Sequence, residues 1–568
     1  MKKVFSTTGK RLILACFFLT LISSAWSQDK LIDILRAELQ REKKIFDTCS
    51  LKPYYISLRV EDTKVQGIQT NFGALIASRE VHQRVLTPTV RVGSYKLDNY
   101  HPESQRFMGS SGLEQMPVDD NDIAIRQSIW SALDRSYRFA INVFGSVKAS
   151  KSVNVAAEDK SMDFTKAEVV KYFEPPMTGS QIRLDRQKWE ARLRKYSALF
   201  LKDPHIISGT ATLSFENSRK YYIDTDGSET AENRISVRVL ISGSVKADDG
   251  MELPLYLSYF SFNPDGLPDD KVIENDVLKL VDKLSKIRTA PVVQPYTGPA
   301  LLLGTASGVF FHEIFGHRVE GQRMRNESDG QTFKKKVGES VLPSTFSVTM
   351  DPTAKKFRGQ DLSGYYNIDD QGVRSEKVNV VVNGILKDFL MTRTPLDGFT
   401  RSNGHARASM GMDVTSRQSN LIVTTSDLKT DAQLRSLLIE EAKKQGKEYG
   451  YIFASVLGGY TLTMTNQPNA FNISPIEVYR VFVDGRPDEM VRGVDLVGTP
   501  LSMFSQIICA GGNSEIYTGY CGAESGNIPV TAVSPSILVK QVEMQRKGKS
   551  TDRPPILDRP TVSLTENN

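Results

Sequence analysis

Two histidines five positions apart on an expected helix place a strict demand on the backbone that carries them. The stretch is FHEIFGHRVEG, residues 311–321, and it contains His312, Glu313 and His317. The common helical zinc motif, H-E-x-x-H, has its histidines four apart, so both lie on one face. At ~100° per residue, side chains five apart diverge by ~140° around a regular helix, against ~40° for four. If both rings bind one metal ion, the helix must contain a π-bulge or a break, for which Gly316 offers a permissive backbone.

A catalytic zinc site also needs a third protein ligand and one open position. The candidates elsewhere in the chain are Glu320, His405, Cys509 and Cys521. Cys521 lies between glycines in YTGYCGAESG, which suits a thiolate presented from a turn, whereas Cys509 follows an apolar run and is typical of a small buried hydrophobe. His312 and His317 could equally be ordinary residues of a half-buried helix, so the spacing alone leaves metal binding open.

The first 27 residues are typical of a signal peptide. Four basic residues precede an apolar run from about 12 to 22, and small residues lead to AWS before Gln28. We therefore expect residues 1–27 to be removed and the mature protein to be exported, to the periplasm or outside the cell. No other apolar run reaches the roughly 18 residues of a membrane helix, so no span is expected in the mature chain.

The charge balance bears on nucleic-acid partners, and the number of cysteines bears on disulfides and metal ligands. The chain has 72 Lys and Arg against 66 Asp and Glu, and the leader holds four of the basic residues and no acidic one. This balance lacks the positive surface that drives nucleic-acid binding, so no nucleic-acid partner is expected. Three cysteines remain after the leader, Cys49, Cys509 and Cys521, so at least one lacks an intramolecular partner. Metal ligation would protect a turn cysteine such as Cys521.

Hydrophobic periodicity predicts an α+β chain in two parts. Helices are expected at 29–47, 162–173, 182–203, 271–288 and 300–324, and strands at 53–100, 211–247, 377–392, 419–427, 460–466 and 478–487. The segment TAPVVQPYTGPA, with its prolines and glycine, is the best domain boundary. We expect an N-terminal domain of helices and antiparallel sheet (28–290), then a largely β domain carrying the metal helix (295–545), and a disordered polar tail (546–568).

Several of these stretches, in the same order, resemble the TldD/PmbA family of zinc metalloproteases, specifically its metal-binding, TldD-like branch. SGVFFHEIFGHRVEGQ resembles the family's H-E-A-x-G-H segment, SNGHARAS its S-x-G-H-x-R stretch, and YCGAESGNIPVTAVSPSILV its closing motif with a metal-binding cysteine. The likeness runs over about residues 295–540. It implies that His312, His317 and Cys521 hold Zn²⁺ and that Glu313 is the catalytic base. The export expected from the leader sets this chain apart from the cytoplasmic members of the family.

The resemblance further implies a zinc-dependent peptidase that hydrolyses peptides or unfolded polypeptide segments, as a homodimer or as a heterodimer with a family paralogue. Glu320 is then either a second-shell group that orients a histidine or a solvated helix charge. His405 is either a substrate-polarising group or a loop histidine bonded to the backbone. Arg407 is a candidate for binding a peptide carboxylate.

Two rival functions belong to other classes. A non-catalytic, zinc-stabilised peptide-binding protein, or a partner subunit of a TldD/TldE-like complex, would keep the fold, but loss of the metal residues would be its signature and all of them are present. A serine hydrolase ranks far behind, because no G-x-S-x-G elbow lies near a suitable histidine.

Overall fold

The computed structural model describes residues 29–102, 113–153, 160–325, 329, 331–463 and 470–548. The expected leader and nearly all of the expected tail lie outside these residues. The fold class is α+β, as predicted, with a largely β C-terminal half. No helix of the described residues is long and apolar enough to cross a membrane.

The N-terminal half is built on an eight-stranded sheet in the order β3-β2-β1-β6-β7-β5, with β4 beside β2 and β8 beside β7. The strands are β1 (Pro53–Asn71), β2 (Ala74–Ser94), β3 (Leu97–Asp98), β4 (Glu114–Met116), β5 (Lys171–Phe173), β6 (Ile206–Asp224), β7 (Glu229–Lys246) and β8 (Glu252–Ser261). Tight turns join the long strands. The stretch DTDG at 224–227 leads from β6 to β7, with Gly227 at φ 110°.

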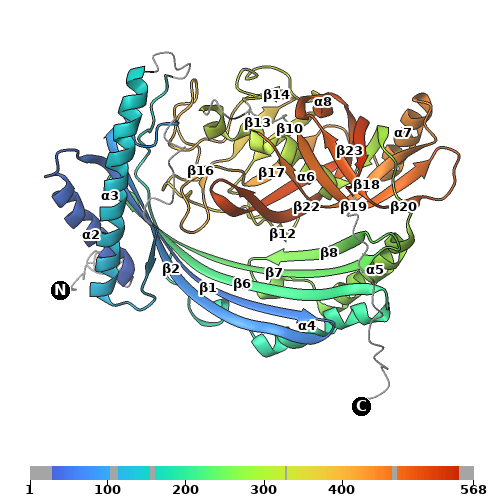
Figure 1. The fold of residues 1–568 in the computed structure, drawn as a ribbon, viewed down its shortest axis with the longest axis horizontal. Helices are drawn as coiled ribbons and strands as arrows, with labels where there is room; N and C mark the ends of the chain where they lie inside the picture. The colour runs from blue at the N-terminus through green and yellow to red at the C-terminus, as the bar shows by residue number, and fades with distance from the viewer. Residues whose placement is uncertain are drawn as a thin grey trace, which may run out of the picture.

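Helices cover this sheet at its two ends (Figure 1). They are α2 (Lys30–Phe46), α3 (Asp122–Val153), α4 (Arg186–Ala198) and α5 (Asp270–Thr289), with short 3₁₀ turns at Gly179–Ile182, Leu199–Lys202 and Pro264–Gly266. Apolar faces of α2 and α3 pack with β1 and β2 in one core, and those of α4 and α5 pack with β6, β7 and β8 in another. The sheet curves, and the C-terminal half sits on its concave side.

The C-terminal half contains an eleven-stranded sheet in the order β14-β13-β10-β17-β23-β21-β19-β18-β9, with β20 beside β19 and β22 beside β23. Its strands are β9 (Tyr296–Leu302), β10 (Phe346–Met350), β13 (Val378–Val382), β14 (Ile385–Leu386), β17 (Asn420–Thr425), β18 (Tyr449–Thr461), β19 (Phe471–Phe482), β20 (Glu489–Val491), β21 (Val494–Gly498), β22 (Ile507–Ala523) and β23 (Gly526–Arg546). Two small ribbons pair β11 (Lys356–Phe357) with β12 (Gln360–Asp361) and β15 (Ala406–Arg407) with β16 (Thr415–Ser416).

One helix of this half is enclosed by the sheet and its loops. The helices are α6 (Gly304–Ile314), α7 (Asp431–Lys444) and α8 (Pro500–Ser505), with 3₁₀ turns at Gly316–Val319 and Gly321–Arg325. Nearly every residue of α6 is buried, and its phenylalanines belong to the largest apolar core of the molecule. A helix that is apolar all round is stable only when it is surrounded by protein. The side chains of α6 are therefore held firmly in place.

Two sequence predictions about helices are wrong. Residues 162–173 form no helix, because backbone N–H groups of Asp163 and Phe164 bond to the carbonyl of Tyr95, and that of Thr165 bonds to the carbonyl of Arg393. The helix expected over 300–324 begins only at Gly304, after β9, and ends at Ile314. Helices α3 and α7 lie in stretches for which the sequence analysis predicted no element.

Buried arginines join the two halves. The Arg393 guanidinium donates to the Thr165 carbonyl (2.9 Å) and to the Asp226 carboxylate (2.7 Å), and it is 1% exposed. The strands of the two large sheets come from either side of residues 262–295. The exact domain limits remain a prediction.

Candidate metal centre

The helix that carries the two histidines breaks between them. His312 and Glu313 lie in the last turn of α6, Phe315 ends it, and His317 lies in the 3₁₀ turn that follows. Arg318 donates from Nη1 to the carbonyls of Glu313 (2.9 Å) and Ile314 (3.0 Å), which satisfies acceptors at the helix end. The break is one of the two departures that the five-residue spacing required.

Gly316 is needed for packing at this break. A Cβ on this residue would lie 1.9 Å from Oε1 of Gln418, which is closer than any real contact. Nε2 of Gln418 in turn donates to the carbonyl of His312 at 3.2 Å. The loop carrying Gln418 is thereby pressed against the break. The sequence analysis attributed Gly316 to backbone freedom, and the close approach of Gln418 is a further reason for a glycine here.

His312, His317 and Cys521 converge. One ligand atom from each lies within 4.8 Å of the others, and all three side chains are buried. The two imidazole centroids are 5.1 Å apart, and Nε2 of His317 lies 3.3 Å from Sγ of Cys521. Cys521 comes from the far end of β22, two residues before the turn of the β22–β23 hairpin. Of the four third-ligand candidates, the structure brings Cys521 to the two histidines.

Arg417 fixes the tip of this hairpin, and the sequence analysis missed it. It is fully buried and donates to the carbonyls of Cys521 (2.6 Å) and Gly526 (3.0 Å) and to the hydroxyl of Ser525 (2.7 Å). Its Nε also lies 3.7 Å from a carboxylate oxygen of Glu320. No spacing or composition in the surrounding TSRQSN marks it. Its burial and its partners 104 to 109 residues away depend on the folded chain.

Glu320 contacts the second histidine. Its Oε2 lies 3.1 Å from Nδ1 of His317 and accepts from Nε of Arg323 at 2.7 Å. Burial raises the pKa of Glu320, but His317 and the two arginines outweigh it and lower this pKa to about 2. Of the two alternatives left by the sequence, a buried group that orients His317 is the one this geometry fits.

The electrostatics favour a thiolate at Cys521. Burial raises the pKa of this thiol, but His317 and His312 more than reverse the effect and hold the pKa well below its usual range. Burial lowers the pKa of His317, yet Cys521 and Glu320 hold it well above its usual range. The thiolate is the form of cysteine that binds metal ions. Two imidazoles and a thiolate beside a cavity are the kinds of ligand that could hold a metal ion here.

A cavity of about 410 Å³ opens beside these side chains and is also lined by Glu313. Glu313 is 8% exposed, and no hydrogen bond to its carboxylate is found among the described residues. The far wall is the bulged part of β18, where Gly459 lies so close that an added Cβ would be 2.9 Å from Cγ of Glu313. The carboxylate is thus confined beside the histidines.

The remaining candidates lie elsewhere. His405 is fully buried: Nδ1 lies 3.1 Å from the Asn403 carbonyl, and Nε2 lies 3.3 Å from the Ser419 hydroxyl. This matches the description of a loop histidine bonded to its surroundings, and burial lowers its pKa to about 3. Arg407 lines a different, larger cavity. Cys509 is buried in a small apolar cluster with Leu434 and Leu438, as its sequence setting indicated.

The chain is similar to proteins that are named as metalloproteases. Residues 295–546 match the family described as PmbA/TldA metallopeptidase C-terminal domain. A metalloprotease of Archaeoglobus fulgidus is 29% identical over 58% of this chain and 72% of its own length. A metalloprotease TldD homolog of Haemophilus influenzae is 26% identical over 60% of this chain and 68% of its own. A zinc metalloprotease TldD homolog of Saccharolobus solfataricus is 24% identical over 57% and 68%.

The fold also has relatives among solved structures. TldE of Thermococcus kodakarensis superimposes with a TM-score of 0.61 over 90% of this chain and all of that one, at 14% sequence identity. The shared fold thus extends to the N-terminal half, which the family model does not cover. Residues 295–546 are thus similar to the C-terminal domain of the PmbA/TldD family, and the relatives that match the chain include TldD homologs.

Proposed function

We propose that this protein is a zinc-dependent peptidase that acts on peptides or unfolded polypeptide segments. The observation that carries the proposal is the convergence of His312, His317 and Cys521 beside a confined carboxylate, Glu313. The names of the relatives support metallopeptidase activity, and one of those names includes zinc.

In this proposal, one set of residues holds the metal ion and another residue transfers a proton. His312, His317 and Cys521 would hold the ion, and Glu320 orients His317 through Nδ1 so that Nε2 faces Cys521. A bound zinc ion supplies Lewis acidity to a peptide carbonyl and makes water a better nucleophile at neutral pH. Glu313 takes the proton from the attacking water and passes it to the leaving amine. Such general acid–base work contributes roughly 10²–10⁴-fold to the rate.

An exposed sheet edge beside the cavity suits an extended substrate. β18 pairs with β9 only through residues 451–453, and within the described chain its later residues pair with β19 alone. Residues Leu457–Thr463 line the metal cavity. A peptide added as a strand at this edge would pass the metal centre with its backbone hydrogen-bonded. An open edge of this kind accepts unfolded segments more readily than compact proteins.

We further propose that the mature protein is exported and works as a dimer, either with itself or with a family paralogue. The leader-like N-terminus and the family resemblance support these two points. Intact-mass analysis of the mature chain tests the first, with an N-terminus expected at or near Gln28. Light scattering of purified protein tests the second.

The test of the peptidase proposal is Glu313→Gln. This change keeps shape and removes the basic carboxylate, so the variant should hold about one zinc per chain while its kcat on a pool of unfolded peptides falls by at least about 100-fold. Glu376→Gln is the matched control, because Glu376 forms an exposed ion pair with Arg401. If wild type and Glu313→Gln both hold zinc and are equally inert, the protein is instead a zinc-stabilised peptide-binding or partner subunit.

A further inference from the structure

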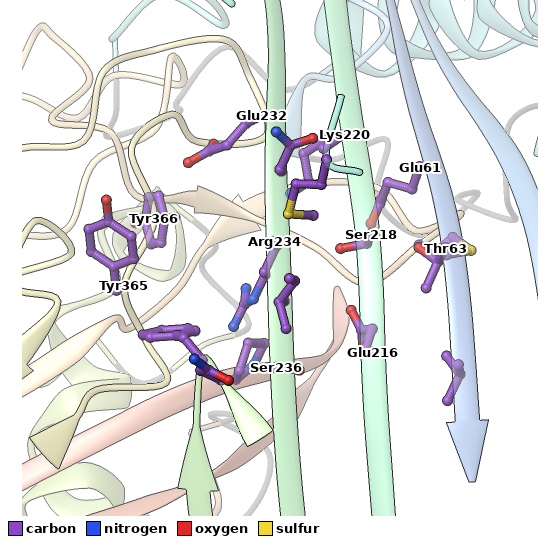
Figure 2. Close-up of a pocket in the computed structure, with 18 of the residues that line it drawn as sticks. Glu61, Thr63, Glu216, Ser218, Lys220, Glu232, Arg234, Ser236, Tyr365 and Tyr366 are labelled. Atoms are coloured by element: carbon purple, nitrogen blue, oxygen red, sulfur yellow. The ribbon is translucent and has the colours of Figure 1, made fainter. Parts of the chain in front are cut away.

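A second cavity, of about 1000 Å³, lies between the two halves of the molecule. Its floor is the concave face of the N-terminal sheet, from which Glu61, Glu216, Ser218, Lys220, Glu232, Arg234 and Ser236 project (Figure 2). Tyr365 and Tyr366 face them from the C-terminal half. The tip of the β22–β23 hairpin forms another wall through Tyr520 and Asn527. The lining is strongly polar for a space of this size.

Two guanidinium groups in this cavity lack an anionic partner. Arg407 is 5% exposed and donates one hydrogen bond, from Nη1 to the Gln418 carbonyl at 2.7 Å. Arg234 donates one, from Nη2 to the Ser363 carbonyl at 2.9 Å. In the part of the chain that the structure describes, neither has a carboxylate within ion-pair distance. A guanidinium has five N–H donors, so each has donors left for a ligand in the cavity.

The neighbouring cations, unlike Arg234 and Arg407, have carboxylates within ion-pair distance. Lys220 pairs with Asp370, and Arg59 lies between Asp370 (3.7 Å) and Glu61 (3.5 Å). Burial lowers the pKa of Arg407 to about 10, and the like charge of Arg234 acts in the same direction. Arg407 remains protonated at neutral pH. A buried positive charge without a counter-charge costs free energy that a bound anion would recover.

The shape and the other charges of the cavity narrow the class of anion. The Tyr366 ring lies 4.8 Å from the Arg407 guanidinium carbon, which keeps the planar fork in one orientation. A fixed fork matches the two oxygens of a carboxylate. Glu61, Glu216 and Glu232 line the same space, so a multiply charged anion would be repelled while a ligand with both anionic and N–H groups would find partners for each.

We propose that this cavity binds the carboxylate of a peptide through Arg234 and Arg407, with the acidic floor receiving the peptide's N–H and cationic groups. The carboxylate belongs either to a peptide C-terminus or to an acidic side chain. Tyr520 lines both this cavity and the metal cavity, so a peptide bound here can continue past the hairpin to Glu313. That the bound peptide is a substrate rests on the proposed peptidase function; that the cavity binds a carboxylate does not.

The test measures binding without turnover, using the full chain with Glu313→Gln. Three fluorescent, N-acetylated hexapeptides are compared by anisotropy: polyalanine with a free C-terminal carboxylate, the same peptide as a C-terminal amide, and the amide with one internal glutamate. A hydrogen bond to a charged group is worth enough to weaken the plain amide by about tenfold or more. Recovery by the internal glutamate shows that a side-chain carboxylate can also occupy the site, and no recovery restricts the site to the C-terminus.

Arginine variants then locate the site. Arg234→Gln should remove the difference between acid and amide, and Arg407→Lys, which keeps the charge but not the fork, should reduce it. Arg401→Gln, at an exposed ion pair outside both cavities, should leave it unchanged. Circular dichroism confirms folding, and Arg407→Lys decides if Arg234→Gln does not fold. Equal binding of all three peptides by the parent, or an undiminished difference in a folded Arg234→Gln, would overturn the proposal. Hydrolysis by the Glu313 protein, assayed separately, shows whether the peptidase function stands.

Discussion

In the cavity beside α6, buried charges meet opposite charges: Glu320 contacts His317 and Arg323, and the Cys521 thiol lies against His317. In the cavity between the sheets, the hydrogen bonds of the Arg234 and Arg407 guanidinium groups within the described residues go to carbonyl oxygens. The first cavity is small, and most of its buried charges have an opposite charge nearby. The second is larger and holds two guanidinium groups without an ion-pair partner among the described residues, which suits recognition of a ligand that supplies an anionic group.

The largest expected effect separates the two cavities. His317→Ala should lose most of the zinc and reduce peptide hydrolysis to background, because two ligands do not hold a catalytic zinc. Binding of the free-acid hexapeptide should change by less than about threefold, since Arg234 and Arg407 lie apart from the ligands. Metal analysis, a peptide assay and anisotropy measure the three quantities. Equal loss of zinc and of acid-selective binding would show that the cavities form one site.

A variant of Arg417 tests how much this one side chain stabilises the tip of the β22–β23 hairpin, which lines both cavities. Arg417→Met removes three hydrogen bonds to residues 521–526 and leaves Glu320 with one fewer cation. The free energy of unfolding should fall by about 3–5 kcal/mol, the usual cost of removing one partner of a buried charged pair. Urea denaturation followed by circular dichroism measures it. Arg401→Met, at an exposed pair, should stay within about 0.5 kcal/mol.

The loop of residues 402–409 carries one fully buried side chain, that of His405, and another, that of Arg407, which lines the cavity between the sheets. The pKa of His405 is lowered to about 3, below the ordinary value of 6.5, so below pH 6.5 the unfolded chain binds more protons than the folded one. The stability from this group is complete above pH 6.5 and is lost as pH falls toward 3, by about 1.4 kcal/mol per pH unit.

The contribution of His405 to the free energy of unfolding, measured by urea denaturation, should therefore be about 2 kcal/mol larger at pH 7 than at pH 5. In His405→Gln the difference should be smaller, and in His205→Gln, which changes an exposed histidine, it should match the parent. Identical pH dependence in parent and His405→Gln would mean that His405 is not the titrating group.

The smallest expected effect probes how tightly the metal cavity confines Glu313. Gly459→Ala adds a methyl group 2.9 Å from Cγ of Glu313 and 3.0 Å from the Asn472 carbonyl, so the carboxylate must shift by a fraction of an ångström. We expect kcat to fall roughly tenfold with zinc retained, because small displacements of a catalytic group are costly. Gly67→Ala, where nothing lies within 4 Å, is the control. A wild-type kcat in Gly459→Ala would show that the cavity is looser than the contacts indicate.

Those parts of the fold and of the site that depend on neighbouring residues could be predicted from the sequence. Five-residue spacing predicted a departure from regular helix. The glycines around Cys521 suggested a turn at this residue, whereas Cys521 lies in strand β22 and the hairpin turn follows at 524–525. Helix α7 was missed although Thr430 and Gln433 form a capping box that its sequence spells out. For α3, the Asn121 side chain that accepts from the N–H of Ala124 was a comparable but weaker signal.

The remainder depends on contacts between distant segments. Thr165 runs extended because its N–H and hydroxyl bond to the Arg393 carbonyl, 228 residues away, and no local pattern reveals that partner. Arg417 and Gln418 take their roles from the hairpin and the helix break that they touch. The unpaired state of Arg234 and Arg407 likewise follows from which carboxylates the tertiary fold brings near, and which it does not.

The β22–β23 hairpin has one more consequence, which concerns folding accuracy. Neighbouring residues of a strand point to opposite faces, so the pairing of Cys521 with Ile528 directs the thiol toward the histidines and the Tyr520 side chain to the other face of the strand. A slip of one residue would turn the thiol outward and bring the phenol ring toward the histidines. Two features oppose such a slip. The pairing is irregular between Ala510 and Ser514, and Arg417 donates hydrogen bonds to the hairpin tip. Alignment of one hairpin thus decides whether Cys521 meets the two histidines in the folded molecule.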